Sequence, residues 1–390
     1  MKIGSRWLSS VVAVGSLFLV YPSYGWWDQG HETVAKIAED MLTPAAKEGV
    51  RALLEYPLEA PGSLDLWKKT KTMSTSASWA DYIKQPLFKE NAKADPYGPP
   101  CHYMDVIVYS SEISKVKTDR AEIERRTIEE RQKKKALLSC IAEMTQVLME
   151  KKPADDRKAI ALRYIIHVIG DLHEPLHTVS IGASRGEEFK HNEGGNLTKI
   201  PKVTIPLVAM KQADSVLIKK STDVRNLHLL WDAGVGAFPQ IPFHRLVKPR
   251  DLNYIGTQLQ SDAITKMAKE LGGLVKAVSK EDATEPSLVN WVTEEILVAL
   301  NYAYENLDLN YPDFPFATDF TDRAQYLKRG RIASRRQMAL AGYRLGQILN
   351  AVFDPEHAQP SYVDFVTRLA SRPVAMNSDQ QPGQEGVDGE

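Results

Sequence analysis

The stretch of sequence that is most informative about this chain is Arg163-Tyr-Ile-Ile-His167-Val-Ile-Gly-Asp171-Leu-His173-Glu-Pro-Leu-His177. Its apolar residues predict a buried helix, and His167 and Asp171, four residues apart, project from one helical face and can share a metal. A second pair with this spacing, His228 and Asp232, follows in Asn226-Leu-His228-Leu-Leu-Trp-Asp232. Imidazole plus carboxylate is a normal ligand set for zinc. Because the chain has only nine histidines, these two pairs and His177 together predict a polynuclear zinc site.

Periodic apolar residues predict that the rest of the chain is also mostly helical. We expect helices over residues 31–42, 118–150 and 156–174, and another that begins near Asn226. Two further apolar stripes lie near the C-terminus: Val292, Ile296, Ala299, Ala303 and Leu307, and then Met338, Ala341, Leu345, Ile348 and Val352. Residues 182–205, rich in Gly, Lys and Asn, predict a long loop with one hairpin around Thr198 to Leu207. The expected fold is therefore all-α with a minor β-hairpin.

The two ends of the chain differ in composition from the rest. Lys2 and Arg6 precede an apolar stretch over residues 7–20, and small residues follow it, which predicts a signal peptide over residues 1–25 that is cleaved after Gly25. An uncleaved anchor is less favoured, because the apolar run is shorter than the ~20 residues that a span needs. The polar tail, residues 372–390, predicts disorder. This leaves one domain, residues 26–371, in a secreted or periplasmic protein without stable membrane association.

Charge and cysteine content limit the possible functions. The formal net charge is −1 for the whole sequence, and removal of the signal peptide takes away two cations and no anions. The mature chain therefore has no excess of positive charge with which to bind the phosphates of duplex DNA. If it binds phosphate, metal ions must supply the positive charge. In an exported chain, Cys101 and Cys140 favour a single disulfide. The alternative is that Cys101, beside His102, is a metal ligand.

Six segments of the chain resemble, in family order, the zinc-dependent single-strand-specific nucleases, which are the fungal and plant type I nuclease/3′-nucleotidase family. The segments are Trp26-Trp-Asp-Gln-Gly-His31, Ser78-Trp-Ala-Asp81, His102-Tyr-Met-Asp105, residues 167–177, Glu193-Gly-Gly-Asn196 and residues 226–232. That family shares its fold with the trinuclear-zinc bacterial phospholipases C. The resemblance thus implies a phospholipase C/nuclease-like helical fold, and it is weaker in the final helices.

The resemblance also implies three Zn²⁺ ions per chain. The first zinc would be held by Asp81, His102, His167 and Asp171. The second would use the amino group and carbonyl of Trp26 together with His31, and would share Asp171. The third would be bound by His177, His228 and Asp232. Pro175 agrees with this division, since it cannot donate a helical hydrogen bond and so turns His177 away from the face of His167.

The mechanism implied by the resemblance is in-line attack on phosphorus by a zinc-bound water that is ionised near neutral pH. Asp81 would orient that water or accept its proton. Lys84 stands where the family usually has arginine. It supplies a positive charge for phosphate but cannot donate the two parallel hydrogen bonds of a guanidinium. Asn196 would contact phosphate, Tyr103 would stack on a base, and Asp105 would bond the edge of that base. Stacking accepts every base and requires an unstacked strand.

We therefore expect a monomeric endonuclease that cuts single-stranded DNA and RNA to 5′-phosphorylated products and also acts on 3′-nucleotides, with no duplex-specific DNA binding. Three alternatives are a phosphatidylcholine-type phospholipase C, a metalloprotease and a zinc-binding module without activity. The phospholipases usually carry glutamate at the position of Asp232 and lack the Gly-Gly-Asn segment. His173-Glu-Pro-Leu-His177 fits the metalloprotease motif, but Pro175 interrupts the helix which that motif needs. His173 is expected to lie beside the ligands or on the substrate side, and not to bind a metal directly. The segment between Asp105 and Asp156 has no predicted function.

Overall fold

The computed structural model of the chain describes residues 26–58, 64–88, 95–132, 136–185, 188–207, 221–238, 240, 249–281, 286–305, 307 and 323–371. The predicted signal peptide and the predicted C-terminal tail lie outside these residues. In the described part of the chain, no helix combines the length and the apolar character that a membrane span requires.

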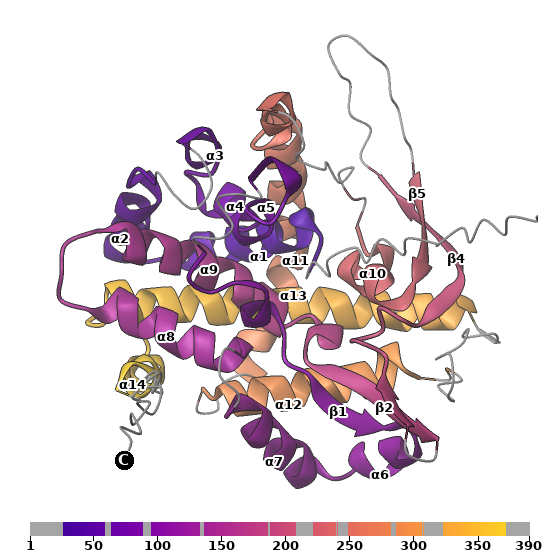
Figure 1. Ribbon diagram of the computed structural model, residues 1–390. Helices are drawn as coiled ribbons and strands as arrows, with labels where there is room; N and C mark the ends of the chain where they lie inside the picture. The colour runs from indigo at the N-terminus through magenta and orange to yellow at the C-terminus, as the bar shows by residue number, and fades with distance from the viewer. Residues whose placement is uncertain are drawn as a thin grey trace, which may run out of the picture.

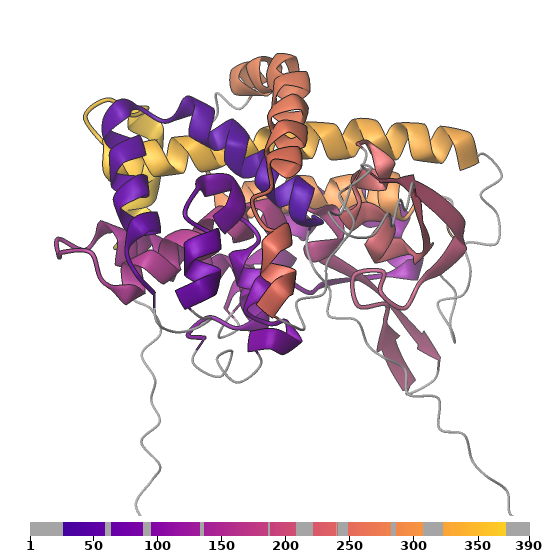
Figure 2. The ribbon, with the colours of Figure 1, turned by 90° about the horizontal axis from the view of Figure 1, so that it is seen from above.

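Helices dominate the described structure, which confirms the mainly α-helical prediction (Figure 1). The longest, α13 (Arg323–Phe353), runs across the middle of the molecule, and α1 (Asp28–Met41), α9 (Asp156–Leu172) and α11 (Gln258–Glu281) pack against it. Seen from above in Figure 2, α11 crosses α13 and the strands lie to one side of the helices. The remaining α-helices are α2 (Pro44–Glu55), α3 (Leu64–Lys69), α4 (Met73–Ser76), α5 (Trp79–Tyr82), α6 (Ile113–Val116), α7 (Arg120–Arg131), α8 (Leu137–Met149), α10 (Leu227–Asp232), α12 (Leu288–Val298) and α14 (Pro360–Ala370).

Short 3₁₀ turns connect several of these helices: η1 (Pro86–Phe88), η3 (Pro99–His102), η4 (Ser110–Glu112), η5 (Pro175–His177), η6 (Gly234–Gly236) and η7 (Pro249–Tyr254). After α12, the backbone continues as one π-helical segment, η8 (Ala299–Ala303). Apart from Leu307, which follows η8, the two predicted C-terminal stripes lie in α12–η8 and in α13, where Ile296, Ala303 and Leu345 are buried. These stripes form core packing.

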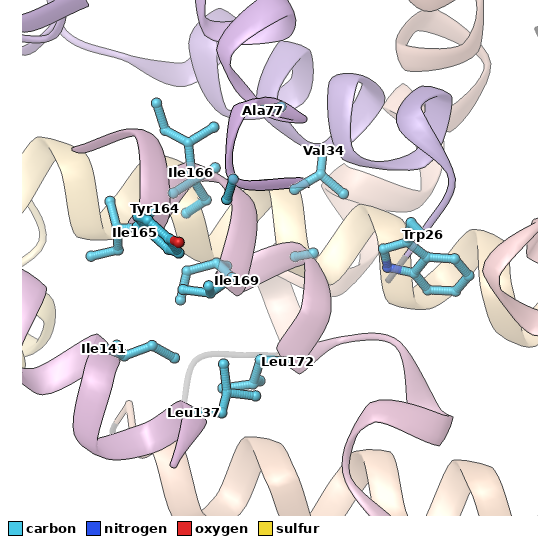
Figure 3. Packing of buried hydrophobic residues seen from close by; sticks show 14 of the residues in the cluster. Trp26, Val34, Ala77, Leu137, Ile141, Tyr164, Ile165, Ile166, Ile169 and Leu172 are labelled. Carbon is cyan, nitrogen blue, oxygen red and sulfur yellow. The ribbon is translucent and has the colours of Figure 1, made fainter. Parts of the chain in front are cut away.

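Helix α9 is the centre of the core, because neighbours on every side cover it. The carboxylate of Asp155 accepts the N–H of Lys158 (2.9 Å) and so starts the helix. Figure 3 shows Ile169 and Leu172 beside Leu137 and Ile141 of α8. The helix ends at Leu172, within two residues of the predicted end, and Pro175 then begins η5. A helix buried on all sides explains why this stretch reads as almost continuously apolar.

The prediction of one long helix over residues 118–150 is wrong. The structure has two helices there, because the charged half and the apolar half pack against different partners: α7 on α12, and α8 on α9 and α14. Helix α8 has its own start, where the hydroxyl of Ser139 accepts the N–H of Ala136 (3.0 Å). Residues 133–135, between the two, lie outside the described residues.

Two small sheets replace much of the loop predicted over residues 182–205. In the first sheet, β1 (Val106–Tyr109) pairs in parallel with β2 (Val179–Arg185), which pairs antiparallel with β3 (Glu188–His191). In the second, β4 (Lys199–Pro206) pairs with β5 (Ser221–Asn226). The predicted hairpin is therefore β4–β5, and its second strand lies farther along the chain than expected. The loop prediction failed where β2 and β3 form, because Gly182 and Ala183 pair there with His191 and Lys190.

Candidate metal centre

The first cluster of the site forms around the side chains that α9 supplies. His102, at the end of η3, brings its Nδ1 atom to 2.9 Å from Oδ2 of Asp171 and to 3.1 Å from Nε2 of His167. The third distance within this group, from Nε2 of His167 to Oδ2 of Asp171, is 3.2 Å. Zinc bonds of about 2.0–2.1 Å in a tetrahedron separate neighbouring ligand atoms by about 3.3 Å. The three atoms therefore have the spacing of ligands around one ion.

Asp81, on the short helix α5, stands next to this cluster. Its Oδ1 atom is 3.6 Å from Nε2 of His167 and 3.8 Å from Nδ1 of His102. Nζ of Lys84 lies 2.6 Å from the same oxygen and 3.5 Å from Nε2 of His102. The structure thus brings together all four predicted ligands of the first zinc and places the predicted catalytic lysine against them.

A second group of ligands forms on the other side of Asp171. Oδ1 of this carboxylate is 3.3 Å from Nε2 of His31, while its Oδ2 faces the first cluster. The ring of His31 stacks on the ring of His167 at 3.9 Å. This approach needs Gly170, because a Cβ there would lie 2.6 Å from Nδ1 of His31. One carboxylate therefore faces two groups of imidazoles, as a bridging ligand would.

Trp26 lies between the helix that carries His31 and the helix that carries Asp232. Its indole is completely buried. The N–H of the next residue, Trp27, donates to the carbonyl of Asp232 (2.8 Å), and the carbonyl of Trp27 accepts the N–H of Gly30 (2.6 Å). The backbone at the predicted mature N-terminus is therefore held next to the candidate ligands.

The third cluster joins η5 to α10. Nε2 of His228 lies 3.2 Å from Nε2 of His177 and 3.5 Å from Oδ1 of Asp232. Glu174 completes this group of potential ligands, although it was not among the ligands predicted from the sequence. Its Oε2 atom accepts the N–H of His177 (2.8 Å). The only sequence signal for this role was the position of Glu174 between ligands, and the metalloprotease motif offered a different explanation for it.

Hydrogen bonds on the outer side of the rings fix how three of these histidines point. Nδ1 of His167 donates to the carbonyl of Ala77 (2.6 Å), and Nδ1 of His177 donates to the carbonyl of His102 (2.8 Å). Nδ1 of His228 donates to the carbonyl of Gly194 (2.7 Å). With the proton on Nδ1, each ring turns an Nε2 lone pair into the cluster, which is how proteins orient histidines that bind metals.

The Gly-Gly turn before Asn196 explains how His228 obtains its partner. Gly194 and Gly195 have φ values of +59° and +87°. A Cβ at Gly194 would lie 2.4 Å from the carbonyl oxygen of Leu176, and 3.3 Å from Nδ1 of His228. Only glycine lets the backbone approach the ring so closely in this conformation. The Gly-Gly segment therefore positions a candidate ligand.

Burial controls the protonation of the site. Burial, followed by the charge of Lys84, lowers the pKa of His102 to about 4. Burial and the neighbouring His177 lower the pKa of His228 to about 3. Both rings are therefore neutral near pH 7, as metal binding requires. Burial first, and then neighbouring carboxylates, raises the pKa of Asp232 well above its usual range. A cation in the third cluster would reverse this effect, because it favours the ionised carboxylate.

Several buried polar atoms of the clusters have no hydrogen-bond partner among the described residues. They are both ring nitrogens of His31, Oδ1 of Asp171, both carboxylate oxygens of Asp232 and Oε1 of Glu174. Each such atom costs about 1–3 kcal/mol when it is left unsatisfied. Their concentration at one place, with nitrogen and oxygen donors at ligand spacing, fits bound zinc ions.

The predicted substrate-binding residues lie at the edge of these clusters. Tyr103, which follows the candidate ligand His102, is 45% exposed. Oδ2 of Asp105 is 3.5 Å from Nδ1 of His191. The side-chain amide of Asn196 donates to the carbonyl of Glu193 (2.9 Å), within the Gly-Gly turn. Their roles toward a substrate stay predictions.

His173 does not join the clusters. Its Nδ1 atom donates to the carbonyl of Ile169 (2.7 Å), and its Nε2 atom accepts from the buried guanidinium of Arg344 (3.0 Å). Since both nitrogens are used, His173 and His177 do not converge on one ion as the metalloprotease motif requires. The geometry therefore argues against a metalloprotease.

The cysteines form the disulfide Cys101–Cys140, with a Cα–Cα distance of 5.6 Å. This confirms the favoured interpretation, and Cys101 is not a metal ligand. The bond ties the residue before His102 to helix α8.

Fold and site together define the class of protein: a mainly α-helical chain in which five histidines, three aspartates and one glutamate form adjoining candidate metal-binding clusters. The chain belongs to the S1/P1 nuclease family, whose family model matches residues 26–354. It is thus a nuclease, a hydrolase that acts on nucleic acids, and the resemblance that six sequence segments carried is confirmed.

Curated relatives are similar at low identity. Nuclease S1 of Aspergillus oryzae is 23% identical over 224 residues, which cover 57% of this chain but only 59% of that protein. Endonuclease 4 of Arabidopsis thaliana is 23% identical over 90% of this chain and 97% of its own length. Endonuclease 2 of the same plant is 22% identical over 89% of this chain and 98% of its own length.

Proposed function

We propose that this nuclease is a secreted, zinc-dependent endonuclease of single-stranded DNA and RNA that also removes phosphate from 3′-nucleotides. The observation that carries the proposal is the set of adjoining buried clusters in which backbone carbonyls orient three imidazoles toward candidate ions. The similarity to Nuclease S1 and to two plant endonucleases supports the same reaction class.

Three zinc ions per chain fit the residues that the clusters contain. The first would be held by Asp81, His102, His167 and Asp171. The second would be held by Trp26, His31 and Asp171. The third would be held by His177, His228 and Asp232. Bound zinc would supply a hydroxide near neutral pH and would stabilise negative charge on phosphate oxygens.

The residues of the chain would orient and bind the substrate. Asp81, held at 2.6 Å by Lys84, would accept the proton of the attacking water, and Lys84 would contact the equatorial phosphate oxygens. Asn196 would contact the phosphate. The exposed ring of Tyr103 would stack on a base, and Asp105 would bond the edge of that base. Stacking on an exposed ring explains a preference for unpaired strands.

The organisation of the protein follows from the same proposal. Cleavage of residues 1–25 would free the amino group of Trp26, and residues 26–371 would form one monomeric nuclease domain. The product would leave with a 5′-phosphate. A phospholipase C acting on phosphatidylcholine-type lipids is the alternative, and the family match disfavours it.

A substrate panel tests the proposal. The mature protein, loaded with zinc, is assayed on single-stranded DNA, RNA, duplex DNA, 3′-nucleotides and phosphatidylcholine. We expect rapid cleavage of both single strands, release of phosphate from 3′-nucleotides, and slow or no cleavage of the duplex. Equal rates on single strands and duplex, or hydrolysis of the lipid in place of nucleic acid, would contradict the proposal.

A further inference from the structure

Glu174 is a completely buried acid in the turn between helix α9 and η5. Hydrogen bonds fix this turn: the N–H of Glu174 donates to the carbonyl of Asp171 (3.0 Å), and the N–H of His177 donates to the carbonyl of Glu174 (3.0 Å). Oε2 of Glu174 accepts the same N–H of His177 (2.8 Å). One oxygen of the carboxylate is therefore anchored beside a candidate ligand of the third cluster.

The second oxygen of this carboxylate has no such contact. Oε1 of Glu174 forms no hydrogen bond with any residue that the structure describes, and the side chain is shielded from solvent. Within the described ranges, no lysine or arginine forms an ion pair with Glu174 either. A carboxylate that is buried without a partner is costly, so Oε1 needs either a proton or a cation.

The charged neighbours of Glu174 favour a cation over a proton. Glu295 and Asp171 repel the charge of Glu174, and Glu174 in turn repels the charge of Asp232. A proton on one of these acids would remove the charge of that acid alone. A divalent cation between Glu174 and Asp232 would attract both carboxylates at once, because a bound metal ion is the largest charge in such a site.

The geometry of the third cluster allows such a shared ion. One ligand atom from each of Glu174, His177, His228 and Asp232 lies within 4.8 Å of the other three. Two ligand atoms on opposite sides of one zinc are about 4 Å apart, since each bond is about 2.0–2.2 Å long. Small movements of the side chains therefore bring all four atoms to one ion. Two imidazoles and two carboxylates are a normal tetrahedral ligand set for zinc.

We propose that Glu174 is a fourth protein ligand of the third zinc, which it binds through Oε1. This inference rests on the zinc binding proposed above and goes beyond it, because His177, His228 and Asp232 are the only ligands assigned there. The carboxylates of Glu174 and Asp232 together balance the charge of one Zn²⁺, and two neutral imidazoles complete the coordination. The third zinc is therefore held more tightly than three ligands with a single carboxylate could hold it.

Glu174→Gln tests the ligand and preserves the turn. The amide oxygen still accepts the N–H of His177, while the amide nitrogen takes the place of Oε1 and offers zinc no charge and no ligand atom. We expect the affinity for one of the three zinc ions to fall at least about 100-fold, the upper end of the usual cost of losing a hydrogen-bond partner of a ligating histidine. The zinc content of the loaded protein, measured while a chelator competes for the ions, gives this affinity.

Glu295→Gln is the matched control, because Glu295 is an equally buried acid near Glu174 that lies outside the group of four ligands. It should release zinc as the wild type does. Cobalt gives a second measurement, since the visible spectrum of bound Co²⁺ depends on its ligands and their geometry. The spectrum of the cobalt-loaded protein should change in Glu174→Gln and stay unchanged in Glu295→Gln.

Three results would overturn the assignment of Glu174. They are wild-type affinity for all three ions in Glu174→Gln, a loss of affinity spread equally over the three ions, and a cobalt spectrum that this substitution leaves unchanged. The first would leave Glu174 as a residue that only stabilises the turn. A wild type that binds no zinc would instead overturn the proposed function itself.

Discussion

A buried imidazole has two nitrogens to satisfy, and in this protein the outer nitrogen of three histidines is bonded to a backbone carbonyl. The spacing of His167 and Asp171 was readable in the sequence, because residues four apart share a helical face. The carbonyl partners of the three histidines could not be predicted, since Ala77, His102 and Gly194 come from turns distant in sequence. Glu174 was missed for a different reason, because its place in the third cluster depends on the turn after α9.

Because Gly194 approaches His228 so closely, adding a single methyl group at this position should disturb the candidate metal site. In Gly194→Ala, the Cβ would collide with the carbonyl of Leu176 in a backbone conformation with positive φ. The turn must shift, and His228 loses its orienting carbonyl. We expect the affinity for the third zinc to fall about 10- to 100-fold, which is the usual cost of losing a hydrogen-bond partner of a ligating histidine. Competition with a chelator measures this affinity.

Gly272→Ala is the control for this substitution. Gly272 lies within α11, and a Cβ there would meet nothing within 4 Å. Alanine should stabilise the helix by up to about 1 kcal/mol and leave zinc affinity unchanged. Equal zinc affinity in both variants would contradict the role given to Gly194.

Glu295 gives a prediction about pH. Burial raises the pKa of this carboxyl to about 8, against an ordinary value of 4.5. The folded protein therefore keeps a proton that the unfolded chain has released, and stability is lost as the pH rises from about 4.5 to about 8. Glu295→Gln removes this loss, so its Tm relative to the wild type should increase between pH 5 and pH 8. A difference in Tm that is constant or falls over this range would show the assignment to be wrong.

Among the elements, the sequence predicted best those whose apolar pattern has a single explanation. Helix α9 and its end before Pro175 were predicted closely, because proline cannot continue the hydrogen-bonded helix. The parallel pairing of β1 with β2 was not predictable, since the strands are far apart in sequence and each is short. The break between α7 and α8 was missed because charge alternation and apolar periodicity are both compatible with one continuous helix.

The disulfide between η3 and α8 gives a prediction at this scale. It closes a loop of 39 residues, and replacing both cysteines by serine should lower the free energy of unfolding by about 3–4 kcal/mol. Because Cys101 precedes the candidate ligand His102, the variant should also bind the first zinc less tightly. Urea unfolding of the zinc-loaded proteins measures the first effect. A loss well under 1 kcal/mol would mean that the disulfide does not constrain this segment.

Across the whole molecule, the candidate ligands are spread over residues 26 to 232, so an unfolded chain presents no preformed site. If zinc binds as proposed, we therefore expect metal binding and folding to be coupled. We expect removal of the metal ions by a chelator to lower the Tm, and added zinc to restore it. Free zinc at about 1,000 times a site's Kd should contribute about 4 kcal/mol for that site. A Tm that does not respond to zinc would contradict the coupling.

The zinc content of the purified mature protein, measured together with its N-terminal sequence, decides whether the clusters and the processed N-terminus form one three-zinc site. We predict three zinc ions per chain in protein that begins at Trp26, and fewer in each variant that removes a candidate ligand. Protein that begins at Trp26 and still holds fewer than three ions at saturating zinc would contradict it.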